Sequence, residues 1–305
     1  MTKRSACPWI TRLVPLVLVV APAACGDPAG AGGDGSGETD GDGGARLPDG
    51  GDREFPPDGD PAGCRKVDVV IAVDNSGSMQ EEKAALRDVV FPAFARALLA
   101  VGGGLEDFRV GVLDACPDPA GFHTRGAGGA CTFSSGQVWM ESTSPDLAAE
   151  FRCVGDIDSG GSRCTGNNDD EQPASAAAAS LEPPASTGPN QGYARDDALL
   201  VVVAITDEDE QPTPDRSAQE IHDRLVTARG GQVERMVLLG IGGGSACSGV
   251  YGGAQEAVKL KATTDLFIAE GRGVWWDLCQ GRLEDGLTQA MAVIDEACRD
   301  LPVIP

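Results

Sequence analysis

Three segments of the chain are apolar at almost every position and rich in β-branched residues. They are VDVVIAV at 67–73, ALLVVVAIT at 198–206 and MVLLGIGG at 236–243. A strand with one solvated face alternates apolar and polar residues, whereas these runs do not, so both of their faces must be buried. Helical patterns separate the runs. This arrangement is typical of a mostly parallel sheet, and we predict an α/β fold: a doubly wound, six-stranded sheet with helices on both faces.

Weaker signals complete the predicted elements. We expect further strands at 108–115, 137–141 and 273–278, and helices at 79–101, 145–151, 171–182, 215–229 and 283–298. Pro92 should bend the first of these helices, because proline lacks the backbone N–H that the helix needs. Asp215 should cap the fourth helix.

The first 62 residues carry the signals of an exported protein rather than of a fold. A basic start precedes an apolar run at 13–24, which has the length of a signal-peptide core. The run ends at Cys25, which resembles the lipid-carrying cysteine of bacterial lipoproteins, although Pro22 stands where such signals usually have leucine. We predict a signal peptide at 1–24 and an outer-membrane lipoprotein lipidated at Cys25, with a soluble secreted protein as the alternative. The membrane contact would be through the lipid anchor only.

A linker and one domain follow the signal. Residues 25–62 are rich in Gly, Asp and Pro, and we expect a disordered acidic linker because such a segment buries too little apolar area to fold. Residues 63–305 are long enough for one domain with a sizeable core. The formal net charge of the chain is −23. This excess of acidic residues argues against nucleic acid as a partner and is compatible with a bound cation.

The cysteines predict disulfides. Once Cys7 and Cys25 are set aside with the signal, eight remain, an even number in an exported chain. The absence of a CxxC motif and the presence of only two histidines make a zinc site a poor interpretation. The least entangled pairing, which we expect, is Cys64–Cys298, Cys116–Cys131, Cys153–Cys164 and Cys247–Cys279.

Oxygen-bearing side chains follow two of the buried runs. Asp74, Ser76 and Ser78 come directly after the strand at 67–73, and Asp207 comes directly after the run at 198–206. If these strands are neighbours, their carboxyl ends meet at one edge of the sheet, where ligands of open α/β sheets bind. Carboxylates and hydroxyls without sulfur or imidazole are ligands for a hard cation. We predict a divalent-cation site, with Mg²⁺ as the first expectation and Ca²⁺ or Mn²⁺ as alternatives.

At these residues the chain resembles the von Willebrand factor A domain family. VDVVIAVDNSGSM is similar to the first strand and metal loop of that family, whose metal-ion-dependent adhesion site begins Asp-x-Ser-x-Ser, and VVVAITD is similar to its later strand ending in Thr-Asp. The resemblance covers roughly 66–299. It implies a metal set of Asp74, Ser76, Ser78 and Asp207, completed by a threonine from the loop before the middle helix. Thr165 is the threonine available there, but Asp169, Asp170 or Glu171 lies nearer to the predicted helix.

The resemblance also implies ligand binding without catalysis. We expect an extracellular or periplasmic protein or polysaccharide to bind the cation through an acidic group. A structural envelope protein whose metal only stabilises the fold is the alternative, and a metal-dependent hydrolase is a weaker one, because no second set of metal ligands is evident.

The acidic run after the second buried strand, the two histidines and two of the tryptophans have no role in the predicted site. The acidic run Glu208, Asp209 and Glu210 is interpreted equally well as a solvated loop or as part of a ligand site. We expect His123 and His222 to be surface residues, and Trp275 and Trp276 to be one buried and one surface ring.

Overall fold

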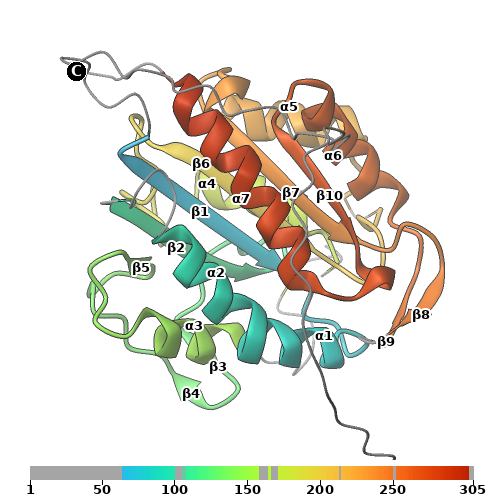
Figure 1. Cartoon of the computed structure of the whole chain (residues 1–305), viewed down its shortest axis with the longest axis horizontal. Helices are drawn as coiled ribbons and strands as arrows, with labels where there is room; N and C mark the ends of the chain where they lie inside the picture. Colours follow the sequence, from blue (N-terminus) through green and yellow to red (C-terminus); the bar gives the residue numbers. More distant parts are fainter. Residues whose placement is uncertain are drawn as a thin grey trace, which may run out of the picture. The chain divides into compact units, whose positions relative to one another are not determined.

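A six-stranded sheet forms the centre of the domain in the computed structural model, which describes residues 64–99, 105, 107–157, 164–165, 171–212, 214–249 and 252–301. The expected signal peptide, Cys25 and the linker lie outside these residues. The strands lie in the order β10-β7-β6-β1-β2-β5, and all neighbouring pairs are parallel except β2–β5 (Figure 1). Their bounds are β1 (Lys66–Val73), β2 (Asp107–Asp114), β5 (Met140–Glu141), β6 (Leu199–Ile205), β7 (Met236–Gly242) and β10 (Gly273–Asp277). The predicted fold class is confirmed.

Helices cover both faces of the sheet, which explains the apolar runs. Along β1, Val69 and Ile71 belong to one hydrophobic cluster, whereas Val70 and Ala72 belong to a second one on the opposite face. The first cluster includes side chains of α2 (Phe91–Leu98), α3 (Leu147–Gly155) and α7 (Leu283–Asp300). The second includes side chains of α4 (Pro173–Leu181), α5 (Ala218–Thr227) and α6 (Val258–Ala269). Figure 1 shows α2 and α7 in front of the sheet. A strand buried in this way has no solvated side, so polar alternation would be costly.

The helix predicted at 79–101 changes its hydrogen-bonding pattern in the middle. It begins as α1 (Gln80–Ala85), continues as the π-helical turn η1 (Leu86–Val90) and resumes as α2. The π-helical turn ends at Val90, two residues before Pro92, which has no backbone N–H to donate to an α-helical hydrogen bond. The extra residue in the turn rotates its surface, and Val89, which fits the buried stripe of a regular helix, is 54% exposed.

Among the described residues, two small antiparallel hairpins and two 3₁₀ turns lie outside the central sheet. The hairpins are β3 (Arg125–Gly126) with β4 (Gly129–Ala130), and β8 (Cys247–Gly249) with β9 (Gly252–Ala254). The turns are η3 (Val233–Arg235) and η4 (Leu278–Gln280). Across the ranges that the structure covers, no helix is both long and apolar enough to cross a bilayer.

Half of the expected disulfide pairing is wrong. Cys64–Cys298 and Cys247–Cys279 are present as predicted. The four middle cysteines pair as Cys116–Cys164 and Cys131–Cys153, not as Cys116–Cys131 and Cys153–Cys164. The reason is the hairpin β3–β4, which packs against α3 and so brings Cys131 to the helix that carries Cys153. Cys116 at the end of β2 is then left for Cys164.

Two predicted local roles are also corrected. Ser217, not Asp215, caps α5: its hydroxyl accepts from the backbone N–H of Glu220, whose carboxylate in turn accepts from the backbone N–H of Ser217. His222 is not a surface residue. It is only 8% exposed, with its ring against Phe267, because it lies on the side of α5 that faces α6.

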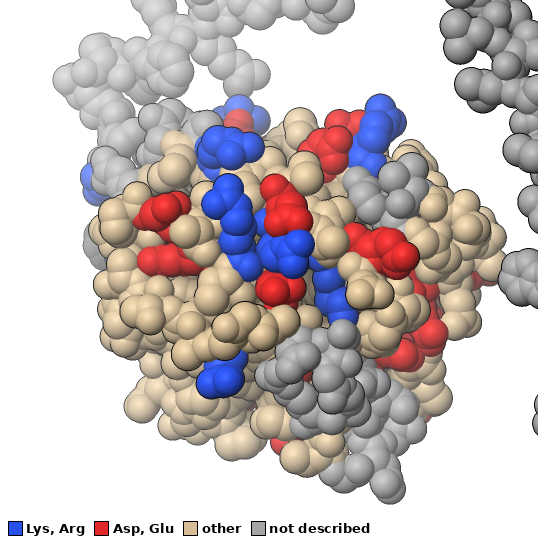
Figure 2. All heavy atoms as spheres, turned by 90° about the horizontal axis from the view of Figure 1, so that it is seen from below, with Lys and Arg blue, Asp and Glu red and all other residues tan. Residues whose placement is uncertain are grey.

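Basic and acidic side chains lie side by side on one face of the domain. On the face shown in Figure 2, lysine and arginine side chains gather in a band, and aspartate and glutamate side chains lie among them. Several basic residues of the domain are indeed in ion pairs, such as Arg195 with Asp107 and Lys66 with Asp197. Where described residues are coloured on this face, acidic side chains therefore interrupt the basic ones.

Candidate cation site

The sheet register brings the two predicted segments together. β1 and β6 are neighbours, and Val73 lies opposite Ile205. The backbone N–H of Asp74 extends this pairing by one step, donating to the carbonyl of Ile205 at 2.9 Å. Asp74 and Thr206 therefore stand side by side where both strands end. The condition on which the predicted site depends, that these two strands are neighbours, is therefore met.

Asp74 is held by one hydrogen bond from each segment. Its Oδ1 accepts from the backbone N–H of Ser76 at 2.7 Å, and its Oδ2 accepts from the hydroxyl of Thr206 at 2.7 Å. The side chain is fully buried. Burial raises the pKa of Asp74 to about 6, although the bonds from Thr206 and Ser76 oppose this rise. Nearby Asp207 adds a further increase to this pKa. The carboxylate is therefore in an environment that favours added positive charge.

Thr206 is a residue of the candidate site that sequence reasoning did not single out. Its Oγ1 donates to Asp74 and accepts from the backbone N–H of Glu208 at 3.0 Å, so it connects β1 to the chain after β6. The available signal was its position directly before Asp207, at the end of an otherwise apolar run.

Three of the other four predicted ligands, Ser76, Ser78 and Asp207, lie near this carboxylate. The hydroxyls of Ser76 and Ser78 are 2.9 Å apart. The Ser78 hydroxyl also lowers the pKa of Asp207, although burial of Asp207 is the larger effect and raises it. Asp207 is 2% exposed, and its Oδ1 is buried without a hydrogen-bond partner. A buried carboxylate oxygen without a donor is costly, and it marks a place for a cation or a proton.

A lysine is also part of this edge. Lys83, in α1, donates from Nζ to the backbone carbonyls of Asn75 at 3.2 Å and Ser76 at 3.1 Å. Its charge lowers the pKa of Asp207. The neighbouring Glu82 is buried, and this burial raises its pKa to about 7, with Asp207 contributing to the increase. The site thus contains an internal positive charge that the sequence analysis did not consider.

Thr165 has its partner elsewhere. Its hydroxyl donates to Oδ2 of Asp118 at 2.8 Å, and its backbone N–H donates to the Asp118 carbonyl at 2.8 Å. The adjacent disulfide Cys116–Cys164 holds it beside the segment that follows β2. The hydroxyl of Thr165 is therefore bound to Asp118, which is not one of the predicted cation ligands. Asp169 and Asp170 lie outside the described residues, and Glu171 accepts through its backbone carbonyl from the N–H of Gln211 at 3.3 Å.

The acidic run after Asp207 is neither a solvated loop nor one shared site. Asp209 accepts from the backbone N–H groups of Lys259 and Leu260 in the first turn of α6, at 2.9 to 3.0 Å. Glu210 accepts from the backbone N–H of Ala174 at 2.5 Å and from the hydroxyl of Ser175 at 2.8 Å, in the first turn of α4. Each carboxylate satisfies N–H groups that a helix leaves free at its start. Glu208 accepts from the side chain of Gln211 at 3.0 Å.

The donor atoms fit a hard divalent ion that takes only a few of its ligands from the protein. Across the described residues, no group of three or more His, Cys, Asp or Glu side chains is arranged to hold a metal. The candidate set consists of two carboxylates and two hydroxyls. Among its oxygen atoms, Oδ1 of Asp207 is buried without a hydrogen-bond partner. Mg²⁺ usually keeps several waters and takes only one or two carboxylates from a protein, so this set matches its requirements better than those of Ca²⁺.

Two solved structures that the chain resembles are remote from it in sequence. No family model matches the chain, and a search of curated proteins gives no match. Among solved structures, a von Willebrand factor type A protein from Catenulispora acidiphila is similar over 76% of this chain and 43% of its own, with 14% identity and a TM-score of 0.41. Proximal thread matrix protein 1 from the mussel byssus is similar over 77% of this chain and 49% of its own, with 12% identity and a TM-score of 0.42. The chain thus spans less than half the length of either protein, and likenesses this distant carry no functional conclusion.

Proposed function

We propose that the domain holds a divalent cation, Mg²⁺ before Ca²⁺ or Mn²⁺, and binds a partner through it. Ser76 and Ser78 would be ligands through their hydroxyls. Asp207 would be a ligand through Oδ1, and Asp74 would act directly or through a water while orienting Ser76. The partner would be an extracellular or periplasmic protein or polysaccharide that presents an acidic group, in a metal-ion-dependent adhesion site without catalysis.

One observation carries this proposal: the buried, unpartnered Oδ1 of Asp207 beside the buried Asp74. Two carboxylates in a low-dielectric place repel each other, and a divalent ion would relieve this repulsion. When bound, the cation would supply positive charge and a coordination place that an acidic group of the partner can take from water. Ser76 and Ser78 are half-buried and exposed, respectively, so this place would face solvent.

Lys83 favours a second candidate function. Its ammonium already supplies a positive charge at this edge, bound to the carbonyls of Asn75 and Ser76. In this alternative the domain is a structural envelope protein in which a cation only stabilises the fold, and no acidic partner binds. The two candidates agree on cation binding and differ on the ligand.

The first prediction separates these candidates with two measurements. At about 100 times its Kd, Mg²⁺ should stabilise the domain enough to raise Tm by about 5–10 °C, with a further rise proportional to the logarithm of its concentration. A resin carrying polyglutamate should retain the protein in Mg²⁺ and release it in EDTA. Without the cation the two acidic partners repel each other, because the chain has a net charge of −23.

Asp74→Ala is the test variant, and Asp265→Ala on the exposed side of α6 is its control. Asp74→Ala should lose both the rise in Tm and the retention, whereas the control should keep both. An unchanged Mg²⁺ response in Asp74→Ala would reject the cation site. A normal rise in Tm without retention on the resin would favour the structural alternative.

We further propose that the protein is exported and anchored to the outer membrane by a lipid on Cys25. The four disulfides of the domain support export, because such bonds persist in oxidising compartments. The second prediction concerns membrane fractionation of cells that express the chain. Wild-type protein should sediment with membranes, and Cys25→Ser should move to the soluble fraction; equal partitioning of the two would contradict the anchor.

A further inference from the structure

Glu82 is a buried carboxylate beside the candidate cation site that the predicted ligand set does not use. It lies in α1 and is 1% exposed, and among the described residues its Oε2 has no hydrogen-bond partner. The side chain lines a small space under the hairpin β8–β9, with Gly252 and Cys279, and this space has no room for a water molecule. Water in it therefore cannot supply the missing hydrogen bond.

Three buried carboxylates act on one another at this edge of the sheet: Asp74, Asp207 and Glu82. Burial is the largest cause of the raised pKa of Glu82, and the charges of Asp207 and Asp74 raise it further. Burial likewise raises the pKa of Asp74, and Asp207 adds to that rise. Mutual repulsion of this kind is relieved only by positive charge placed among the carboxylates.

Lys83 supplies one positive charge to this group. Its side chain is buried, and its Nζ donates to the carbonyls of Asn75 and Ser76 in the loop between β1 and α1. Burial raises the pKa of Asp207, and the charge of Lys83 opposes that rise. Three carboxylates and one ammonium leave two negative charges. One divalent cation would cancel them, whereas a monovalent ion would leave a negative charge and a trivalent ion would add a positive one.

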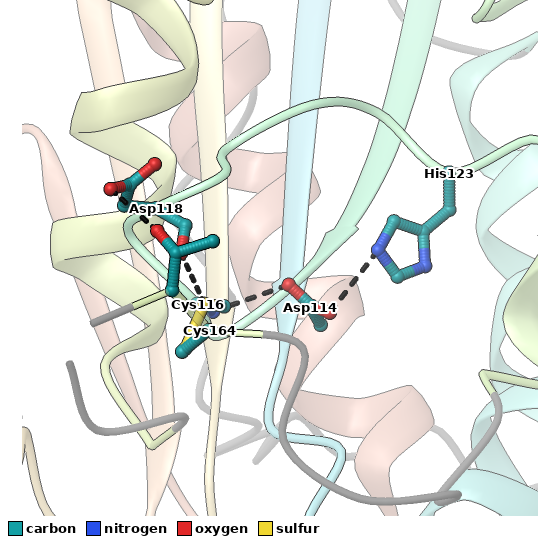
Figure 3. The surroundings of a disulfide bond; sticks show 6 residues. Asp114, Cys116, Asp118, His123 and Cys164 are labelled. Atoms are coloured by element: carbon teal, nitrogen blue, oxygen red, sulfur yellow. Dashed lines mark hydrogen bonds and ion pairs between the residues drawn. A yellow bond between two sulfur atoms is a disulfide. The ribbon is translucent and has the colours of Figure 1, made fainter. Parts of the chain in front are cut away.

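Two other buried carboxylates have partners in other segments. Oδ2 of Asp114, at the end of β2, lies 3.2 Å from Nε2 of His123, and Oδ1 accepts from the backbone N–H of Cys116 at 3.3 Å (Figure 3). The ring of His123 is only 10% exposed, so the prediction that it is a surface residue is wrong. Glu210 is bound at both oxygens by the first turn of α4. We therefore assign neither carboxylate to the group around the cation site.

We propose that Glu82 and Lys83 set the charge of the cation that this edge accepts. The inference rests on the proposed cation site and adds two residues to it, neither of which is a ligand. Glu82 acts through space as a third negative charge, and Lys83 cancels the charge of one carboxylate. The buried edge is then electrically neutral with a divalent cation bound, so an acidic group of a partner would bind by completing the coordination of the cation rather than through a net positive charge.

Glu82→Gln is the test variant, because glutamine keeps the shape of the side chain and removes its charge. Affinities of the full chain for Mg²⁺ and La³⁺ are obtained from the rise in Tm with ion concentration. The pH is 7.5, above the pKa of Glu82, which burial raises to about 7. The variant should bind Mg²⁺ about tenfold and La³⁺ about thirtyfold more weakly than the wild type, because the energy between two charges is proportional to the charge of the ion.

Glu81→Gln is the matched control, since Glu81 is the preceding residue and is exposed. It should change either affinity about twofold at most. Equal effects of the two variants, or an equal loss for both ions in Glu82→Gln, would overturn the proposal, because a lost ligand or a distorted loop does not scale with the charge of the ion. A wild type whose Tm responds to neither ion would reject the cation site itself, and this inference with it.

Two further measurements separate charge from structure. Adding Lys83→Gln to Glu82→Gln restores two negative charges, so the double variant should bind Mg²⁺ within about threefold of the wild type. In EDTA, where no cation takes part, Glu82→Gln alone should raise Tm by about 2–4 °C because it removes a buried charge without a partner. Glu81→Gln should not raise it. An unchanged or lower Tm of Glu82→Gln in EDTA would show that this charge is already compensated and would contradict the proposal.

Discussion

Replacing Arg195 with methionine should lower the free energy of unfolding by about 3–5 kcal/mol, because it leaves a buried carboxylate without its counterion. Asp68 is the one acidic residue inside β1, and it is fully buried. Arg195 donates from Nε to its Oδ1 at 2.9 Å and from the backbone N–H to its Oδ2 at 2.7 Å. The methionine variant would keep only the backbone bond.

The destabilisation caused by Arg195→Met should increase as the pH rises. Burial raises the pKa of Asp68, and the charge of Arg195 opposes that rise. Without Arg195 the pKa rises further, so the folded variant binds a proton more tightly than the unfolded chain does. The destabilisation is therefore smallest in acid, where Asp68 is protonated in both states, and grows as the pH rises. Urea denaturation of the wild type and of Arg195→Met, at an acidic and at a neutral pH, measures this change in destabilisation.

Lys66→Met is the matched control for this experiment. Lys66 also pairs with an aspartate, Asp197, but both side chains are more than a third exposed. Exposed pairs contribute at most about 1 kcal/mol, so the control should change stability little. A similar small effect in both variants would show that Arg195 is not the counterion that keeps Asp68 in the sheet.

The sheet and the position of the candidate site could be predicted from the sequence for a simple reason. Short runs that are apolar at almost every position and rich in β-branched residues favour the middle of a covered parallel sheet, and the chain direction then puts their ends at one edge. Asp74 and Asp207 follow two such runs directly, so their meeting required only that β1 and β6 be neighbours. This inference used local pattern and sheet geometry.

Features that depend on how loops fold could not be predicted in the same way. The pairing of Cys131 with Cys153 follows from the packing of β3 against α3, and no spacing in the sequence encodes it. The partner of Thr165, Asp118, lies 47 residues away in the chain. His123 likewise belongs to a segment without periodicity, and only the structure brings it to Asp114.

The second large effect on stability is expected at Glu210, in the acidic run after β6. Glu210→Ala should cost about 2–4 kcal/mol, because it leaves the buried N–H groups of Ala174 and Ser175 without their acceptor at the start of α4. Glu210→Gln keeps an acceptor oxygen and most of the volume, so at pH 5 its cost should stay within about 1 kcal/mol.

Raising the pH should favour the glutamine variant. Burial raises the pKa of Glu210 to about 7 from its usual 4.5. The folded wild type therefore holds this proton more tightly than the unfolded chain, and it loses stability as the pH rises from about 4.5 to 7, by up to about 3 kcal/mol. Glutamine does not titrate. Glu210→Gln should thus become the more stable of the two at pH 8, as measured by urea denaturation in EDTA.

The same variants test whether Glu210, which accepts hydrogen bonds at the start of α4, also contributes to the cation site. If Glu210 only caps α4, Glu210→Gln must keep the Mg²⁺-dependent rise in Tm, whereas Asp207→Asn, three residues earlier, must lose it. Loss of the response in both variants would place Glu210 in the cation site and contradict its role as a cap. A retained response in both would remove Asp207 from the site. Glu82, whose Oε2 is also buried without a hydrogen-bond partner beside Asp74 and Asp207, would then be the carboxylate to replace next.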